Sequence, residues 1–210
     1  MWVSECTSAG VKILTMQETT VFVGASFTDC ERDLFPPYGN GFVQIIAESG
    51  RLPGGVINAG ISGNRVIDLV NRWDTDVLAH SPTRVSITIG LNDTWRRYDS
   101  NDPTSAEDFE VRYRNIIART ISQTSAEIIL CEPVLIPLNP KMETWREDFD
   151  PKIQVIHRLA AEYGVKLITF NSFLNAKASE RSALELTLDG IHPTRLGHEL
   201  VAEYWLQAVL

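Results

Sequence analysis

Asp189 and His192 lie three positions apart in an Asp-Gly-Ile-His-Pro segment near the C-terminus. Glycine and proline bound a rigid turn here, so the carboxylate can reach one imidazole nitrogen while the other nitrogen faces a nucleophile. An acid held in this way fixes the tautomer of the histidine and stabilises the imidazolium that forms when the ring takes a proton. The pair therefore indicates a general base whose nucleophile comes from elsewhere in the chain.

Ser26 is the candidate nucleophile, because it stands in a Gly-Ala-Ser turn directly after the apolar run at 20–24. A serine on the turn that leaves a buried strand can expose its hydroxyl at the edge of a sheet. Taken alone, the serine is weak evidence, since serines close turns and cap helices in many proteins.

Two further segments could supply hydrogen-bond donors to an oxyanion. Asn92, in a Gly-Leu-Asn-Asp segment, has a side-chain amide, and Gly60 has a backbone N–H that no side chain shields. The structural alternatives are an Asx-turn at Asn92 and a Gly-rich strand-to-helix turn at Gly60. The Gly60 segment is a poor dinucleotide-binding fingerprint, because Asn58 stands where its first glycine would be.

The hydrophobic pattern predicts how the fold brings these segments together. Short β-branched runs alternate with longer segments of helical periodicity, which is typical of βαβ units and a mainly parallel sheet. Strands are expected at 20–24, 55–58, 84–89, 127–131 and 165–170, and helices near 41–49, 64–79, 105–123, 150–163 and 194–209. Pro151 is expected in a first helical turn.

We therefore predict an α/β fold, a single three-layer doubly wound domain with a five-stranded, mainly parallel sheet. Ligands bind outside the carboxyl ends of the strands in such sheets. Ser26, Gly60 and Asn92 each follow a predicted strand, and Asp189 and His192 precede the last helix. The domain should span residues 19–210, and residues 1–18 form an arm or extension without clear periodicity, which could take part in contacts between copies of the chain.

Composition excludes several other classes of protein. The 210 residues are 44% hydrophobic and 22% charged, as in ordinary globular proteins. Nineteen Lys and Arg against 27 Asp and Glu give a net charge of −8, which argues against nucleic-acid partners and against docking on an anionic membrane. Cys6, Cys30 and Cys131 are an odd, widely spaced set, which argues against a disulfide framework or a structural zinc site. No secretory signal or transmembrane run is recognisable, so a cytoplasmic location is expected.

The serine, glycine, asparagine and Asp-x-x-His segments follow one another in the order of the four sequence blocks of the SGNH hydrolase superfamily, the GDSL esterases. From about Thr20 to Leu210 the chain resembles that family. The resemblance implies a flavodoxin-like fold and a serine esterase without metal or cofactor. Ser26 would be the nucleophile, His192 the base and Asp189 its orienting acid, and Ser26, Gly60 and Asn92 would form the oxyanion hole.

The context of these blocks narrows the expected substrate. Segments such as Ile-Gly-Leu-Asn-Asp-Thr-Trp-Arg and Trp-Arg-Glu-Asp are similar to the branch that contains bacterial xylan acetylesterases. This similarity implies small acyl esters, acetyl esters first, on a carbohydrate such as a xylo-oligosaccharide. Because sugar rings stack on aromatic faces, Tyr38, Trp95, Arg96 and Trp145 are the candidate substrate-binding residues. Ordinary packing is the alternative for each tryptophan.

One departure from the family pattern keeps other functions open. Ala25 stands where the family usually has aspartate, and alanine cannot accept the hydrogen bonds of a carboxylate. The chain could therefore be a catalytically degenerate sugar-binding relative. A broad-specificity short-chain esterase or thioesterase of the same superfamily is a second alternative. A metal-dependent phosphoesterase is a third, and its ligands would be Asp29, Asp93, Asp189 and His192.

Overall fold

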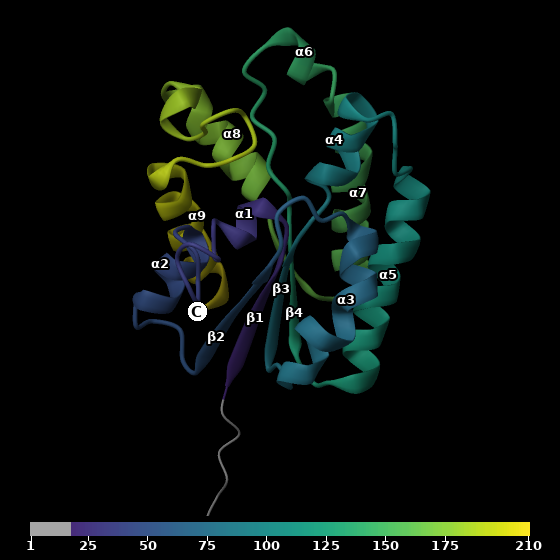
Figure 1. The fold of residues 1–210 in the computed structure, drawn as a ribbon, viewed down its shortest axis with the longest axis vertical. Coiled ribbons are helices and arrows are strands. Elements are labelled where there is room, and N and C mark those ends of the chain that lie inside the picture. Colours follow the sequence, from purple (N-terminus) through teal and green to yellow (C-terminus); the bar gives the residue numbers. More distant parts are fainter. Residues whose placement is uncertain (1–17) are drawn as a thin grey trace, which may run out of the picture.

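A five-stranded parallel sheet forms the centre of the molecule in the computed structural model, which describes residues 18–210 (Figure 1). Residues 1–17 lie outside the described residues, and with them almost all of the predicted arm at 1–18, including Cys6. The strands are β1 (Thr19–Gly24), β2 (Gly55–Gly60), β3 (Arg84–Thr88), β4 (Glu127–Cys131) and β5 (Lys166–Ile168). Their spatial order is β2-β1-β3-β4-β5, and every neighbouring pair is parallel. The predicted fold class is confirmed.

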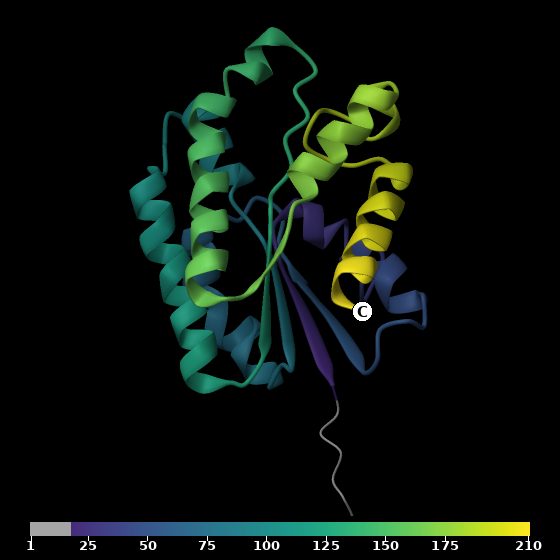
Figure 2. The same ribbon diagram turned by 180° about the vertical axis from the view of Figure 1, so that it is seen from behind.

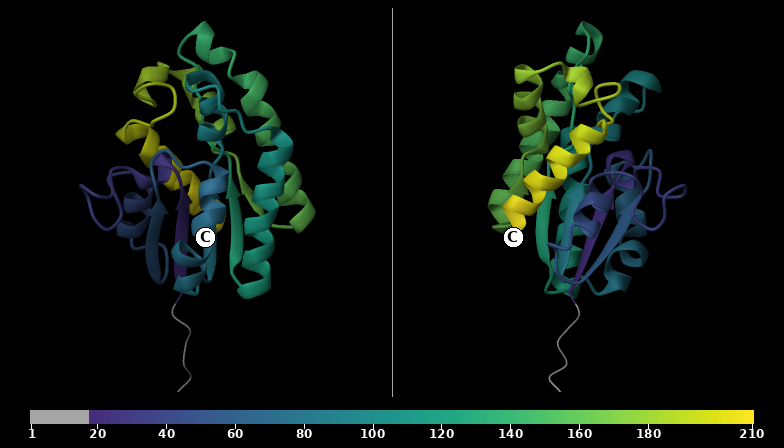
Figure 3. Two further views of the ribbon diagram at one scale, coloured as in Figure 1. Left: turned by 45° about the vertical axis from the view of Figure 1, so that its right-hand side comes forward. Right: turned by 90° about the vertical axis from the view of Figure 1, so that its left-hand side faces the viewer.

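Helices cover both faces of this sheet (Figures 1 and 2). One face carries α3 (Val66–Asp76), α5 (Ala106–Gln123) and α7 (Arg146–Tyr163). The other face carries α2 (Phe42–Glu48), α8 (Phe170–Glu180) and α9 (Arg195–Val209). The remaining elements are α1 (Ser26–Asp29), α4 (Leu91–Asp99), α6 (Pro140–Glu143) and the 3-10 turns Leu78–His80 and Ala183–Glu185. The side views separate the three layers, with α9 crossing one face (Figure 3).

Large apolar side chains fill the two spaces between sheet and helices. Trp73 and Tyr113 are fully buried on one side, and Phe22 and Trp205 are buried on the other. Burying each such side chain contributes about 2–3 kcal/mol to stability. The indole N–H of Trp205 donates to Ser86 Oγ at 3.0 Å, so this buried donor is satisfied. The sheet is therefore a rigid platform for whatever lies at its carboxyl edge.

The element boundaries differ from the predicted ones at functionally important places. β2 continues to Gly60, two residues beyond the predicted end. Helix α4 begins three residues after the end of β3 and α8 two residues after the end of β5, and both are absent from the predicted helices. Helix α7 begins at Arg146, so Pro151 lies in its second turn rather than its first. Within residues 18–210, no helix combines the length and the hydropathy needed to cross a membrane.

Candidate active site

Ser26 lies at the point where β1 turns into α1. β1 pairs with β2 on one side and with β3 on the other, so its end is flanked by both neighbours. Gly24 makes the turn possible, because a Cβ there would lie 2.4 Å from the Thr88 carbonyl oxygen and 2.4 Å from Thr28 Oγ1. The chain therefore packs closely on β3 and presents the serine at the carboxyl edge of the sheet.

Asp189 and His192 lie on a tight turn that precedes α9. The Asp189 Oδ1 atom accepts the backbone N–H of Ile191 at 3.0 Å and that of His192 at 2.8 Å. Gly190 adopts a φ of 96°, a conformation that side chains disfavour. The hydroxyl of Thr194 then accepts the Gly197 N–H at 3.2 Å and caps α9. Hydrogen bonds within the turn itself thus hold the backbone that carries the histidine.

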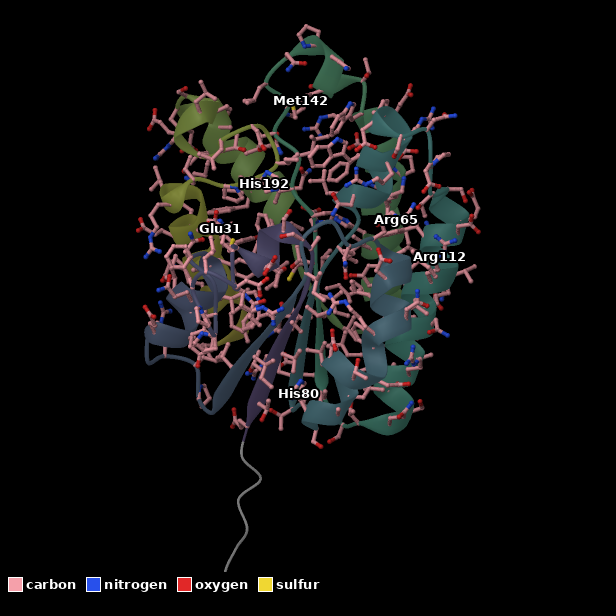
Figure 4. All side chains as sticks on the ribbon, in the orientation of Figure 1. Glu31, Arg65, His80, Arg112, Met142 and His192 are labelled. Atoms are coloured by element: carbon pink, nitrogen blue, oxygen red, sulfur yellow. The ribbon has the colours of Figure 1, made fainter. Side chains whose placement is uncertain are left out.

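The fold brings the three predicted triad residues into one hydrogen-bonded chain. Ser26 Oγ lies 3.0 Å from His192 Nε2, and His192 Nδ1 lies 2.7 Å from Asp189 Oδ2. Partial burial acts to raise the pKa of the Asp189 carboxyl, but hydrogen bonds from the His192 ring and from two backbone N–H groups lower this pKa below its ordinary value. The acid is therefore ionised at neutral pH. Figure 4 shows His192 near the carboxyl ends of the strands, whereas His80 lies at the opposite end.

Asn92, the predicted side-chain donor to an oxyanion, lies beside Ser26. Its side chain is buried at 3% exposure near the start of α4, and it lines a small cavity together with Ser26. One of its amide N–H bonds donates to the Asn64 carbonyl at 2.9 Å, which leaves the second for another acceptor. The backbone N–H of Ser26, at the first position of α1, has no acceptor within residues 18–210.

The prediction that Gly60 supplies an oxyanion donor does not fit the structure. Gly60 is the last residue of β2, and its N–H donates to Asn58 Oδ1 at 2.9 Å. A Cβ at this position would lie 2.3 Å from the Asp29 backbone nitrogen, so this glycine allows α1 to pack against β2. The mismatch arises because the sequence pattern ends the strand at 58 and so places Gly60 in the turn.

Gly63, in the turn that follows β2, is not among the predicted site residues, but its backbone N–H is free within residues 18–210. The N–H groups of Ile61, Ser62 and Asn64 each donate to a protein acceptor. In the described part of the chain, the Gly63 N–H has none. Gly63 has a φ of 83°, and nothing would lie within 4 Å of a Cβ there. The Asn92 side chain contacts the next residue, Asn64. In the sequence, the Gly-x-x-Gly spacing of Gly60 and Gly63 is the one feature that marks Gly63 as a second candidate.

Asp93 has a structural role beside Asn92. Its buried carboxylate accepts the Val66 N–H at 3.1 Å, the first of helix α3. Burial raises the pKa of this carboxyl to about 6, against the opposing effects of the Val66 hydrogen bond, the Lys152 charge and the Thr104 side chain. Asp93 therefore ties α4 to the end of the turn that carries Gly63, rather than capping its own helix.

Two cavities of very different size meet at Ser26. A cavity of about 20 Å³ lies beneath it, lined by Ala25, Leu91, Asn92 and Ile191 among others. A cleft of about 610 Å³ opens on the other side, beside His192. Its other polar lining comes from the loop after α1, from Ser62 in the turn after β2, and from the start of α9. The site can thus hold a very small group on one side and a ring-sized group on the other.

None of the four predicted substrate-binding residues lines this cleft. Trp145 is 8% exposed and packs between Trp95, with ring centroids 6.0 Å apart, and Tyr98, at 5.3 Å. The Arg96 guanidinium lies over the Trp95 ring and pairs with an aspartate one helical turn away. Tyr38 is half-buried, and its carbonyl accepts the Asn58 amide. Trp145 is therefore a packing residue, which is the alternative to substrate binding for each tryptophan.

Cys30 and His198 form a second hydrogen-bonded pair, and both line the same cleft as Ser26. Cys30 Sγ lies 3.3 Å from His198 Nε2 and 3.3 Å from the Phe27 carbonyl. Burial, with the Asp29 and Glu31 charges, raises the pKa of the Cys30 thiol to about 12. Burial, with the Arg195 and His192 charges, lowers the pKa of His198 to about 4. Both groups are therefore neutral at pH 7, and they connect α1 to α9.

The ligands of the phosphoesterase alternative are not grouped. Across residues 18–210, no three His, Cys, Asp or Glu side chains lie together in a way that could hold a metal ion. Asp93 is turned toward α3, and Asp29 Oδ2 accepts the Ser62 N–H and hydroxyl. These carboxylates are therefore already engaged in holding turns together.

Known proteins show the same architecture. Residues 22–200 match the GDSL-like lipase/acylhydrolase family. An acetylxylan esterase of Geobacillus stearothermophilus is 31% identical over 207 residues, covering 91% of this chain and 94% of that protein. The crystal structure of Axe2, an acetylxylan esterase from the same organism, is 31% identical and matches this structure with a TM-score of 0.81, over 91% of this chain and 93% of its own.

Further solved structures extend the comparison. LAE5, described as an alpha/beta hydrolase enzyme from the metagenome of Lake Arreo, Spain, is 28% identical with a TM-score of 0.82, over 91% of this chain and 94% of its own. Structures of Axe2 variants described as catalytic mutants replace a serine, an aspartate or a histidine by alanine. The aspartate and histidine are three positions apart in that chain, as Asp189 and His192 are here.

Proposed function

Because the chain belongs to the GDSL-like lipase/acylhydrolase family, we propose that it is a serine esterase that removes small acyl groups, acetyl first, from carbohydrate alcohols such as xylo-oligosaccharides. The observation that carries the proposal is the hydrogen-bonded chain from Ser26 through His192 to Asp189. A serine hydroxyl is a weak nucleophile until an adjacent base takes its proton, and this chain supplies such a base.

The reaction would proceed through an acyl-enzyme. Ser26 Oγ attacks the ester carbonyl carbon while His192 Nε2 takes the hydroxyl proton, and Asp189 stabilises the imidazolium. The tetrahedral oxyanion accepts hydrogen bonds from the Ser26 N–H, the Asn92 amide and the Gly63 N–H. His192 then protonates the leaving alcohol as the C–O bond breaks. Water, deprotonated by His192, attacks the acyl-serine and releases the carboxylic acid and the free serine.

The small cavity beside Ser26 supports acetyl as the preferred acyl group. Its volume of about 20 Å³ has room for roughly one water-sized group, which is about the size of a methyl group. Ile191 and Leu91, which line it, are backed by the aromatic cluster around Trp145. This packing leaves little room for a longer acyl chain.

The large cleft supports a ring-sized alcohol. Its volume of about 610 Å³ lies in the range of pockets that enclose small organic ligands. Axe2 is described as an acetyl-xylooligosaccharide esterase, and an acetylated xylo-oligosaccharide is therefore the substrate that we propose for this chain. Although Ala25 replaces the aspartate that is usual in the family, Ser26 Oγ still lies 3.0 Å from His192 Nε2.

Hydrolysis of p-nitrophenyl acetate by the wild-type protein and by Ser26→Ala tests this proposal. We expect release of p-nitrophenol that disappears in the variant, together with covalent labelling of the wild type alone by a fluorophosphonate. Asn139 caps α6 with its side chain, away from Ser26, so Asn139→Ser serves as a matched surface control. Equal activity in wild type and Ser26→Ala would refute the nucleophile assignment. A wild type that is neither active nor labelled would favour the sugar-binding alternative.

A further inference from the structure

The loop after α1 begins with two residues in an unusual backbone conformation. Cys30 has a φ of 44° and Glu31 a φ of 57°, both in the left-handed region. Residues other than glycine avoid this region, so a pair of them in succession is held there by the surrounding contacts. Here the two residues turn the chain so that Glu31 lines the same cleft as Ser26 and His192. Figure 4 shows Glu31 and His192 on the same side of the molecule.

The Glu31 carboxylate is held in place by the other end of its loop. The Asn40 amide donates to Glu31 Oε2 at 2.8 Å, and the Asn40 backbone N–H donates to the Cys30 carbonyl at 2.9 Å. The Arg195 guanidinium, from the start of α9, approaches the Asn40 carbonyl at 3.5 Å. Glu31 Oε1 receives no hydrogen bond from residues 18–210. The Glu31 carboxylate thus lines the cleft, and among the described residues only one of its two oxygens has a hydrogen-bond donor.

The lining of the cleft determines which alcohol suits it. Glu31 and Arg195 bring one negative and one positive charge, and His198 is neutral, so the cleft has no net charge to attract a polyanion such as a phosphorylated thioester carrier. The lining contains no Phe, Tyr or Trp side chain among the described residues. A sugar here would be held at its hydroxyl edges by hydrogen bonds rather than by stacking on an aromatic face.

We propose that Glu31 and Asn40 form the subsite for the alcohol half of the substrate, in which the carboxylate and the amide bind neighbouring hydroxyl groups of a neutral sugar. This inference rests on the proposed esterase function and names the residues that select its leaving group. A hydroxyl donating to a carboxylate makes a charge-assisted hydrogen bond, which is stronger than a bond between neutral groups. Removing it should weaken sugar recognition about tenfold.

The test compares two esters in wild type, Glu31→Ala and Asn40→Ala. One ester is an acetylated xylo-oligosaccharide and the other is p-nitrophenyl acetate, whose leaving group has no hydroxyl pair. We expect the ratio of kcat/KM for the sugar ester to kcat/KM for p-nitrophenyl acetate to fall about tenfold in both variants, mainly through KM. Glu31→Gly removes the same carboxylate but keeps the left-handed backbone favourable, so it controls for misfolding of Glu31→Ala. The ratio should fall by the same factor in this variant.

Glu48 provides the matched control, because Gln44 donates to it at 3.2 Å in an exposed amide–carboxylate pair on α2, which does not line the cleft. Glu48→Ala should leave the ratio unchanged. A ratio within twofold of wild type in Glu31→Ala and Glu31→Gly would overturn the subsite, even when both esters are hydrolysed.

Binding measured without turnover separates this inference from the esterase proposal. Calorimetric titration of the Ser26→Ala protein with the acetylated xylo-oligosaccharide should give a Kd that rises about tenfold when Glu31→Ala is added. This result would support the subsite even if the wild type proved inactive on every ester. No measurable binding, or a Kd that Glu31→Ala does not change, would overturn the subsite, while hydrolysis of p-nitrophenyl acetate by the wild type would still support the esterase activity.

Discussion

The carboxylate of Asp189 binds His192 twice. Its Oδ2 atom lies 2.7 Å from the ring nitrogen Nδ1, and its Oδ1 atom accepts the backbone N–H of the same residue at 2.8 Å. One oxygen therefore orients the imidazole, and the other fixes the backbone that carries it. Substitutions at this position can separate the two effects.

Asp189→Asn should lower kcat for p-nitrophenyl acetate about 10⁴-fold with little change in Tm. An asparagine can still accept the backbone N–H groups, but its amide would donate to Nδ1 and leave the proton on Nε2, the nitrogen that must act as base. Asp189→Ala should lose both contacts and lower Tm as well as kcat. A kcat for Asp189→Asn within tenfold of wild type would contradict the proposed role of the acid.

Asn92→Ala should lower kcat about 10²- to 10³-fold, with a smaller effect on KM, because an oxyanion donor acts mainly in the transition state. Steady-state kinetics on p-nitrophenyl acetate would measure this. Asn115, exposed on α5, is the control position, and Asn115→Ala should leave both kcat and KM unchanged. A change in KM alone would contradict the prediction, because it would mean that the Asn92 amide binds the substrate and the transition state equally.

Acetyl esters should be hydrolysed faster than esters of longer acyl chains, because the cavity beneath Ser26 has a volume of only about 20 Å³. A methylene group that a pocket cannot accommodate costs about 10- to 200-fold in kcat/KM. We therefore expect p-nitrophenyl acetate to exceed the butyrate by at least about tenfold, and Leu91→Ala to narrow that difference. Equal or faster hydrolysis of octanoate would instead favour a broad-specificity esterase or thioesterase.

His198→Gln should change how stability depends on pH. Burial lowers the pKa of His198 from 6.5 to about 4, so between these values the unfolded chain binds a proton that the folded protein does not. The stability contributed by wild-type His198 therefore rises with pH from about 4 to 6.5 and is constant above that range. The free energy of unfolding of wild type minus that of His198→Gln should increase by about 3 kcal/mol over this interval.

Urea denaturation at several pH values measures this difference. Asp93, whose pKa is raised to about 6, acts in the opposite direction, because it holds a proton in the folded protein that the unfolded chain releases. Both proteins carry Asp93, so its effect cancels in the comparison. A difference that does not vary between pH 4 and 6.5 would mean that His198 is protonated equally in both states.

The hydrogen-bonded chain of Ser26, His192 and Asp189 is predictable from sequence, because its members lie in one short turn or at a strand end. The Asp-x-x-His turn is complete within a few residues, and Ser26 follows a strand whose central residues are apolar. The parallel sheet then brings the two segments together without further information. The predicted bounds of β4 match the observed ones for the same reason, since a short, β-branched apolar run has few alternatives.

The exact length of the elements cannot be read from the sequence. The hydrophobic pattern ends the second strand at 58, whereas pairing with β1 extends it to Gly60, whose N–H donates to the Asn58 side chain instead of being free for an oxyanion. Trp145 is expected near the substrate, but packing against Trp95 and Tyr98 buries it. Both depend on contacts between distant segments, which no local pattern encodes.

The two sides of the triad are attached to the protein in different ways. Ser26 follows β1, which is paired on both sides, whereas His192 lies on a turn held by the bridge between Thr187 and Pro193 and by nearby backbone bonds. Strands inside a sheet exchange their amide hydrogens only when the whole domain opens, but turns open locally at lower free energy. Gentle warming should therefore release the base while the serine is still held. Activity would then fade reversibly before the domain unfolds, and cooling would restore it.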